Sequence, residues 1–127
     1  MKYKLKKETK PRLTTFGKYK AVAVHHQTVD TQRILKEVAE RDGIGEAEVL
    51  TVMMGLSSVI NEHLRQGDKV RLDTWGLLKL EIESDKVDNE EDFSARKHIR
   101  GVRLHFLPES KHGNQELYND ISFERFK

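Results

Sequence analysis

Cysteine is absent from this 127-residue sequence, and proline occurs only twice, as Pro11 and Pro108. A chain without thiols can form neither a disulfide framework nor a thiolate metal site, and thiol redox chemistry is excluded. The sequence also lacks an apolar run that could cross a membrane or serve as a secretory signal. These absences predict a cytoplasmic protein, and the length predicts about one domain.

Motifs for catalysis and metal binding are missing as well. The chain has no glycine-rich phosphate loop, no nucleophile elbow and no helical pair of zinc-binding histidines. His63, His98, His105 and His112 are scattered, and the acidic residues 85–92 lack the glycine and the final glutamate of a calcium-binding EF-hand loop. We therefore expect no enzymatic activity, cofactor, metal site or small-molecule substrate.

The net charge is only +2, but it is unevenly distributed along the chain. Residues 1–20 contain eight basic side chains and one acid, Glu8, which gives +7 and leaves −5 for the other 107 residues. Residues 83–92 contain six acids and one lysine, whereas residues 96–105 contain four arginines or lysines, two histidines and no acid. The basic stretches are candidate contacts for a polyanion, and ordinary solvated surface charge is the alternative at each single position.

Two extended segments are predicted near the N-terminus. Residues 3–6 alternate apolar with basic side chains, and residues 19–24 have the composition of a mostly buried strand. Pro11, Thr15 and Gly17 lie between them and are typical of turns and loops. The two segments are therefore expected to pair as a β-hairpin.

Two helices are expected next. Asp30 is a suitable N-cap for a first helix that ends at Gly43, and Gly45 can cap a second helix of about five turns that ends at Gly67. The apolar stripe of the second helix consists of Val49, Val52, Met53, Leu56, Val59, Ile60 and Leu64. Because only a few residues connect the first helix to the second, we expect the two to form an antiparallel helical hairpin. The apolar face that the two helices share must be buried against another element.

The second half of the chain predicts a β-hairpin, a third strand ending at Pro108, a short helix and a final strand or docking segment. We expect these elements at residues 70–72 and 78–82, 102–106, 115–119 and 121–126, with a turn at Thr74-Trp75-Gly76. The fold class is therefore α+β, and a thin sheet of three strands can cover only part of the second helix. A second subunit is the simplest way to bury the rest of the apolar surface of this helix.

The order of these elements resembles the bacterial HU/IHF family of histone-like DNA-binding proteins. The resemblance is carried by Leu64-Arg65-Gln66-Gly67-Asp68-Lys69-Val70 after the long helix and by Thr74-Trp75-Gly76-Leu77-Leu78, which replaces the family's Gly-Phe-Gly-Thr-Phe turn. It implies an HU/IHF-like fold, in which a helical hairpin precedes a three-stranded antiparallel sheet with an arm and a short C-terminal helix. It also implies an intertwined homodimer that binds double-stranded DNA in the nucleoid.

The chain departs from this family in two places. Residues 1–28 form a basic β extension ahead of an HU/IHF-like DNA-binding domain at residues 29–127. The arm connection, residues 84–97, is short and half acidic, and it lacks the Arg-Asn-Pro tip with which family members insert a proline between base steps. The sequence thus resembles a divergent HU-related branch with an altered arm, in which kinking of DNA by that arm is in doubt.

The predicted DNA contacts are basic residues on the polar face of the sheet, where Asp73 and Glu81 oppose them, on the return limb of the arm and on the N-terminal extension. They are Arg71, Lys79, Arg96, Lys97, Arg100, Arg103, Lys4 and Lys6. Contacts to phosphates would tolerate any DNA sequence and would weaken steeply with salt. The alternative is an HU-fold protein-interaction module that has lost DNA binding and docks a basic partner on its acidic arm.

Overall fold

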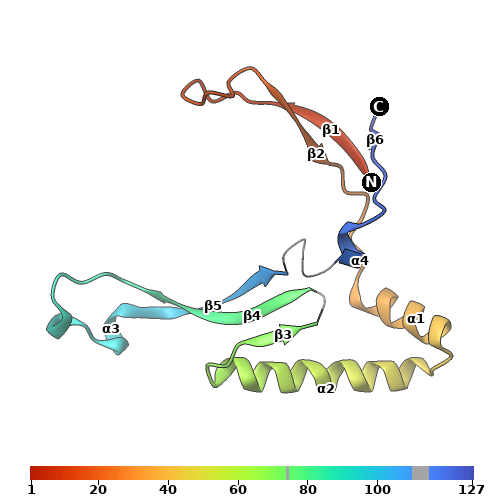
Figure 1. The fold of residues 1–127 in the computed structure, drawn as a ribbon. Coiled ribbons are helices and arrows are strands. Elements are labelled where there is room, and N and C mark those ends of the chain that lie inside the picture. The colour runs from red at the N-terminus through yellow and green to blue at the C-terminus, as the bar shows by residue number, and fades with distance from the viewer. Residues whose placement is uncertain (74, 110–114) are drawn as a thin grey trace.

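The computed structural model describes residues 1–73, 75–109 and 115–127, and within them the chain forms two three-stranded sheets and two long helices (Figure 1). The elements in chain order are β1 (Lys2–Lys7), β2 (Tyr19–Ala23), α1 (Thr31–Asp42), α2 (Glu46–Arg65), β3 (Val70–Leu72), β4 (Gly76–Ser84), η1 (Glu90–Asp92), α3 (Ala95–His98), β5 (Ile99–Pro108), α4 (Gln115–Tyr118) and β6 (Glu124–Arg125). The terminal sheet has the order β2-β1-β6, and the arm sheet has the order β3-β4-β5. The predicted α+β class is confirmed.

The N-terminal hairpin, β1 and β2, forms as predicted. Its strands are antiparallel, with Tyr3 opposite Ala23 and Lys6 opposite Lys20. The final strand β6 is shorter than expected and pairs in parallel with β1, where Lys2 lies opposite Glu124. The terminal sheet therefore joins the two ends of the chain into one unit.

The two predicted helices are confirmed, together with the residues that limit them. The Asp30 carboxylate accepts a hydrogen bond from the backbone N–H of Arg33 at 2.9 Å, which caps the start of α1. Gly43 follows α1 with φ +69°, the left-handed conformation that commonly ends a helix. After this turn α2 runs back along the arm sheet and contacts β3 and β4 (Figure 1).

The arm sheet has the predicted strands, and one glycine sets its tight corner. Val70 lies opposite Leu78 in the β3–β4 pair, and Leu78 lies opposite Phe106 in the β4–β5 pair. Gly76 begins β4 with φ +154°, and a Cβ at this position would overlap the carbonyl oxygen of Leu107. Only glycine fits so close to the neighbouring strand. Thr74 of the predicted turn lies outside the described residues.

Strands β4 and β5 form a long ribbon that ends in the arm tip (residues 85–98). Arg96 and Lys97, expected on the return limb of the arm, lie at this tip in the short helix α3, which was not predicted. The N–H of Asp85 donates to the His98 carbonyl at 2.8 Å, and the N–H of Ser94 donates to His98 Nδ1 at 2.9 Å. These two hydrogen bonds join His98 to Asp85 and to Ser94, so the residues between Ser94 and His98 form a helical turn.

Little apolar surface is buried within one chain. Among the described residues, the buried hydrophobic side chains are Ala39 and Leu64, each 6% exposed, whereas Val52 on α2 and Ile82 on β4 are 69% and 65% exposed. The chain exposes 11561 Å². A compact globular chain of this mass exposes about 7,000 Å². The apolar faces of α2 and the arm sheet are therefore open.

Candidate nucleic-acid interface

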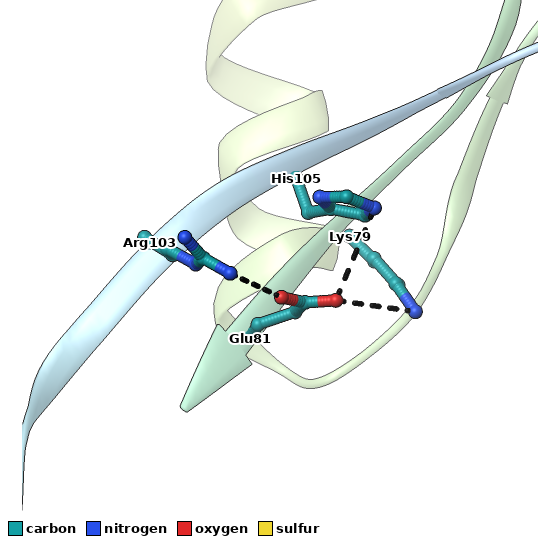
Figure 2. A network of polar contacts seen from close by, with 4 residues as sticks. All are labelled: Lys79, Glu81, Arg103 and His105. Atoms are coloured by element: carbon teal, nitrogen blue, oxygen red, sulfur yellow. Dashed lines mark hydrogen bonds and ion pairs between the residues drawn. The ribbon is translucent and has the colours of Figure 1, made fainter. Parts of the chain in front are cut away.

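The outer face of the arm sheet carries the polar side chains that alternate with its apolar ones. Lys79 lies opposite His105 and Glu81 opposite Arg103, so the strand register places all four on one side of the β4–β5 ribbon. Figure 2 shows these four side chains directed toward one another. By the same alternation Arg71 on β3 shares this face.

Glu81 is the centre of this cluster. Its carboxylate lies 3.2 Å from Arg103 Nη2, 3.5 Å from Lys79 Nζ and 4.0 Å from His105 Nε2 (Figure 2). The hydrogen bond from Arg103 lowers the pKa of Glu81, and the positive charges of His105, Lys79 and Arg103 act in the same direction, against a smaller opposing effect of desolvation. Glu81 is therefore ionised at neutral pH and offsets part of the positive charge of this face.

Two further predicted contacts are also held by carboxylates. Arg71 Nη1 lies 2.6 Å from Glu109 Oε2, and Arg100 Nε lies 2.7 Å from Asp85 Oδ1. Neither acid was predicted as a partner of these arginines. Asp85 directly follows β4 and Arg100 lies near the start of the adjacent strand β5, so the register of these two strands would have predicted their contact. Arg71 on β3 and Glu109 after β5 could not be paired in this way, because β4 lies between β3 and β5.

Arg96 and Lys97 lie together in α3 on the arm tip and are exposed. Within the described part of the chain, neither side chain forms an ion pair. The preceding turn η1 is acidic throughout, with Glu90, Glu91 and Asp92. The arm tip therefore combines two free basic groups with a strongly acidic neighbour.

Lys4 and Lys6 lie on β1 in the N-terminal hairpin and share one face, because residues two apart in a strand point to the same side. Lys20 on β2 lies directly opposite Lys6 and joins them. Among the described residues no carboxylate is paired with any of the three. Like charges directly opposite each other destabilise a strand pair, so a bound anion would reduce the repulsion between these lysines. Lys20 belongs to the basic stretch at residues 1–20 that was predicted as a candidate polyanion contact, and the hairpin register places it beside the individually predicted Lys6.

The eight predicted contacts thus lie on three parts of one chain. Arg71, Lys79, Arg100 and Arg103 are on the arm sheet and are paired with acids. Arg96 and Lys97 are on the arm tip, and Lys4 and Lys6 are on the N-terminal hairpin. Free basic charge is therefore concentrated at the hairpin and the arm tip.

Within the residues that the structure covers, no group of three or more histidines and acids could hold a metal ion. His112, one of the histidines considered above, lies outside these residues. None of the helices in the described ranges is long and apolar enough to cross a membrane.

Comparison with known proteins agrees with this architecture. No curated protein sequence matches the chain. A similar solved structure is that of a candidate bacterial DNA-binding protein from Bacteroides vulgatus, with a TM-score of 0.67 and 14% sequence identity. The match covers 98% of this chain and 47% of that protein, so the chain spans about half of its length. At this identity the similarity concerns the fold.

A family model gives the more specific relationship. The model describes an HU domain fused to a winged helix-turn-helix, immunoglobulin or glycine-rich motif, and it matches residues 1–125. The match includes the N-terminal hairpin as well as the helices and the arm sheet. This chain therefore belongs to the HU-HIG family, an HU-related group.

Proposed function

We propose that this protein is a histone-like, HU-related DNA-binding protein that acts as a homodimer and contributes to organising the bacterial nucleoid in the cytoplasm. It binds double-stranded DNA through the phosphate backbone and tolerates any base sequence. It is not an enzyme, requires no cofactor and acts on no small-molecule substrate. Its family membership and the distribution of its basic residues support this proposal.

The observation that carries the DNA-binding proposal is the N-terminal hairpin with its net charge of +7 over residues 1–20. A concentration of lysines on a ribbon, free of acidic partners, is suited to a polyanion. Each phosphate that such a side chain neutralises releases condensed counterions from the duplex. Because phosphates carry no sequence information, the resulting binding is sequence-tolerant.

The open apolar faces support the homodimer. One chain exposes about 4,500 Å² more than a compact protein of its mass, taking 11561 Å² as its exposed area. Obligate dimers commonly bury about 2,000–5,000 Å² summed over both partners, or about 1,000–2,500 Å² per chain, so the excess is large enough to supply such an interface. The exposed residues Val52, Leu56 and Val59 form a stripe on α2 that a second copy of this helix could cover.

Gel-shift assays on two duplexes of unrelated sequence test this function. We expect both duplexes to be retarded at roughly 50 mM salt with similar affinity, and retardation to be largely lost by roughly 200 mM. Lys6→Gln combined with Lys20→Gln should weaken binding about tenfold. Lys36→Gln combined with Arg41→Gln on α1 removes the same charge elsewhere and should have little effect.

A protein-interaction module is the second candidate, and a specific observation favours it. Four of the eight predicted DNA contacts are engaged by carboxylates, and the arm tip is acidic. Such a surface could dock a basic protein partner. Absence of any gel shift at low salt would reject DNA binding and favour this alternative.

A further inference from the structure

The hairpin tip, residues 9–17, is an ordered loop that joins β1 to β2. Three backbone hydrogen bonds each close a four-residue turn there: Leu13 N to the Lys10 carbonyl at 3.2 Å, Phe16 N to the Leu13 carbonyl at 3.1 Å and Lys18 N to the Thr15 carbonyl at 2.9 Å. Pro11 takes the second position of the first turn, which its fixed φ favours. Gly17 takes the third position of the last turn with φ +82°, where glycine is preferred. The tip therefore has a defined shape.

Two large apolar side chains are exposed on this tip. Leu13 is 45% and Phe16 55% exposed, and they occupy the first and last positions of one turn. The Cα atoms of such positions lie within about 7 Å of each other. In Figure 1 the tip is the free end of the N-terminal hairpin, far from the helices and from the arm sheet. Neither side chain therefore packs into the body of this chain.

Three basic residues lie close in sequence to the apolar pair. Lys10, Arg12 and Lys18 lie within six residues of both Leu13 and Phe16 in the sequence, and all three are exposed. None of them forms an ion pair in the part of the chain that the structure describes. The neighbouring acid Glu8 instead accepts a hydrogen bond at 2.9 Å from the backbone N–H of Lys10. The tip thus combines an aromatic and an aliphatic group with three free positive charges.

A nucleic-acid duplex is a ligand that would contact both the apolar pair and the basic side chains of the tip. It offers a line of phosphates and, between them, the flat apolar faces of stacked bases. Proteins that bend DNA insert side chains such as phenylalanine or leucine between base steps from the minor groove. The other ribbon is poorly suited to this role, because Glu90, Glu91 and Asp92 on the arm tip repel phosphates.

We propose that the hairpin tip is a DNA wedge, in which Phe16, supported by Leu13, enters between two base pairs from the minor groove. Lys10, Arg12 and Lys18 contact the phosphates on either side. This inference rests on the proposed DNA-binding function and adds to it a site that unstacks and kinks the duplex. The wedge lies on the N-terminal extension and not on the arm.

A duplex with 2-aminopurine at a central step tests the wedge, because the fluorescence of this base rises when it is unstacked. We expect the unsubstituted protein to raise the fluorescence and Phe16→Ala with Leu13→Ala to abolish the rise, while binding weakens about tenfold and persists. Phe93→Ala on the arm tip is the matched control. This ring is also exposed, at 42%, and its loss should leave the signal unchanged.

A second variant separates stacking from a general loss of apolar surface. Phe16→Trp in a Trp75→Phe background makes the substituted ring the protein's single indole, and its emission should be quenched when duplex is added. Two results would overturn the wedge and leave the proposed function standing. One is that the wild-type protein binds the duplex without any 2-aminopurine response, and the other is that the response is unaltered after the double alanine substitution. Absence of binding to any duplex at low salt would remove both.

Discussion

Glu81 limits how much positive charge the outer face of the arm sheet can offer to DNA. Its carboxylate contacts Lys79 and Arg103, and the hydrogen bond from Arg103 lowers its pKa, so it remains charged at neutral pH. The same two cations are predicted phosphate contacts. They can bind DNA only if they exchange Glu81 for a phosphate oxygen.

Glu81→Gln should therefore strengthen DNA binding. The substitution keeps the shape of the side chain, removes one negative charge and releases both cations. We expect about threefold tighter binding at low salt and a plot of log affinity against log salt that is steeper by about one unit, measured by fluorescence anisotropy. Glu37→Gln on α1, where Glu37 pairs with Arg33 at 3.3 Å, is the control. Equal effects of the two substitutions would show that only net charge matters.

Gly76 is the residue on which the corner of the arm sheet depends most. Gly76→Ala would require a left-handed backbone and would force a methyl group onto the Leu107 carbonyl, so we expect a loss of about 3 kcal/mol in the free energy of unfolding. Gly101→Ala on β5 meets open space and should change stability by no more than about 0.5 kcal/mol. Urea denaturation of both variants measures the difference, and similar stabilities would contradict this account of the corner.

The long elements follow from local sequence patterns, which is why they could be predicted. The stripe on α2, the Asp30 cap and the alternation in β4 and β5 each reside in one contiguous segment. The parallel pairing of β6 with β1 could not be predicted, because it joins residues more than a hundred positions apart with no local signal. The helix α3 was missed because hydrogen bonds to His98 at the arm tip favour a turn over a longer ribbon.

The stripe on α2 also carries a prediction about association. Val52→Glu would be harmless in a lone chain, where this side chain is largely exposed, but it would place an unpaired carboxylate in the proposed dimer contact. We expect association to weaken at least about 100-fold, as seen by sedimentation velocity at micromolar concentration. Ser58→Glu introduces the same charge on the polar side of α2 and should leave the dimer intact. Identical sedimentation of the two variants would contradict this role for the stripe.

At the scale of the whole molecule, the positions of the basic residues were easier to predict than their partners. Residue type and alternation placed Lys79 and Arg103 on one face, as the register confirms. The same alternation predicted Glu81 on this face, but its contacts with Lys79 and Arg103, and that of Glu109 with Arg71, depend on which strands are adjacent and how they are registered. The sequence therefore predicts where charge lies, whereas the fold determines how much of it is free.

Native mass spectrometry of the protein mixed with a short duplex of arbitrary sequence can decide whether two chains bind DNA together, because it counts chains and DNA in the same complex. We expect a prominent species at low ionic strength to contain two protein chains and one duplex, and to dissociate as the salt concentration rises. Free duplex beside unbound protein at every protein concentration, or complexes that contain a single chain, would contradict this expectation.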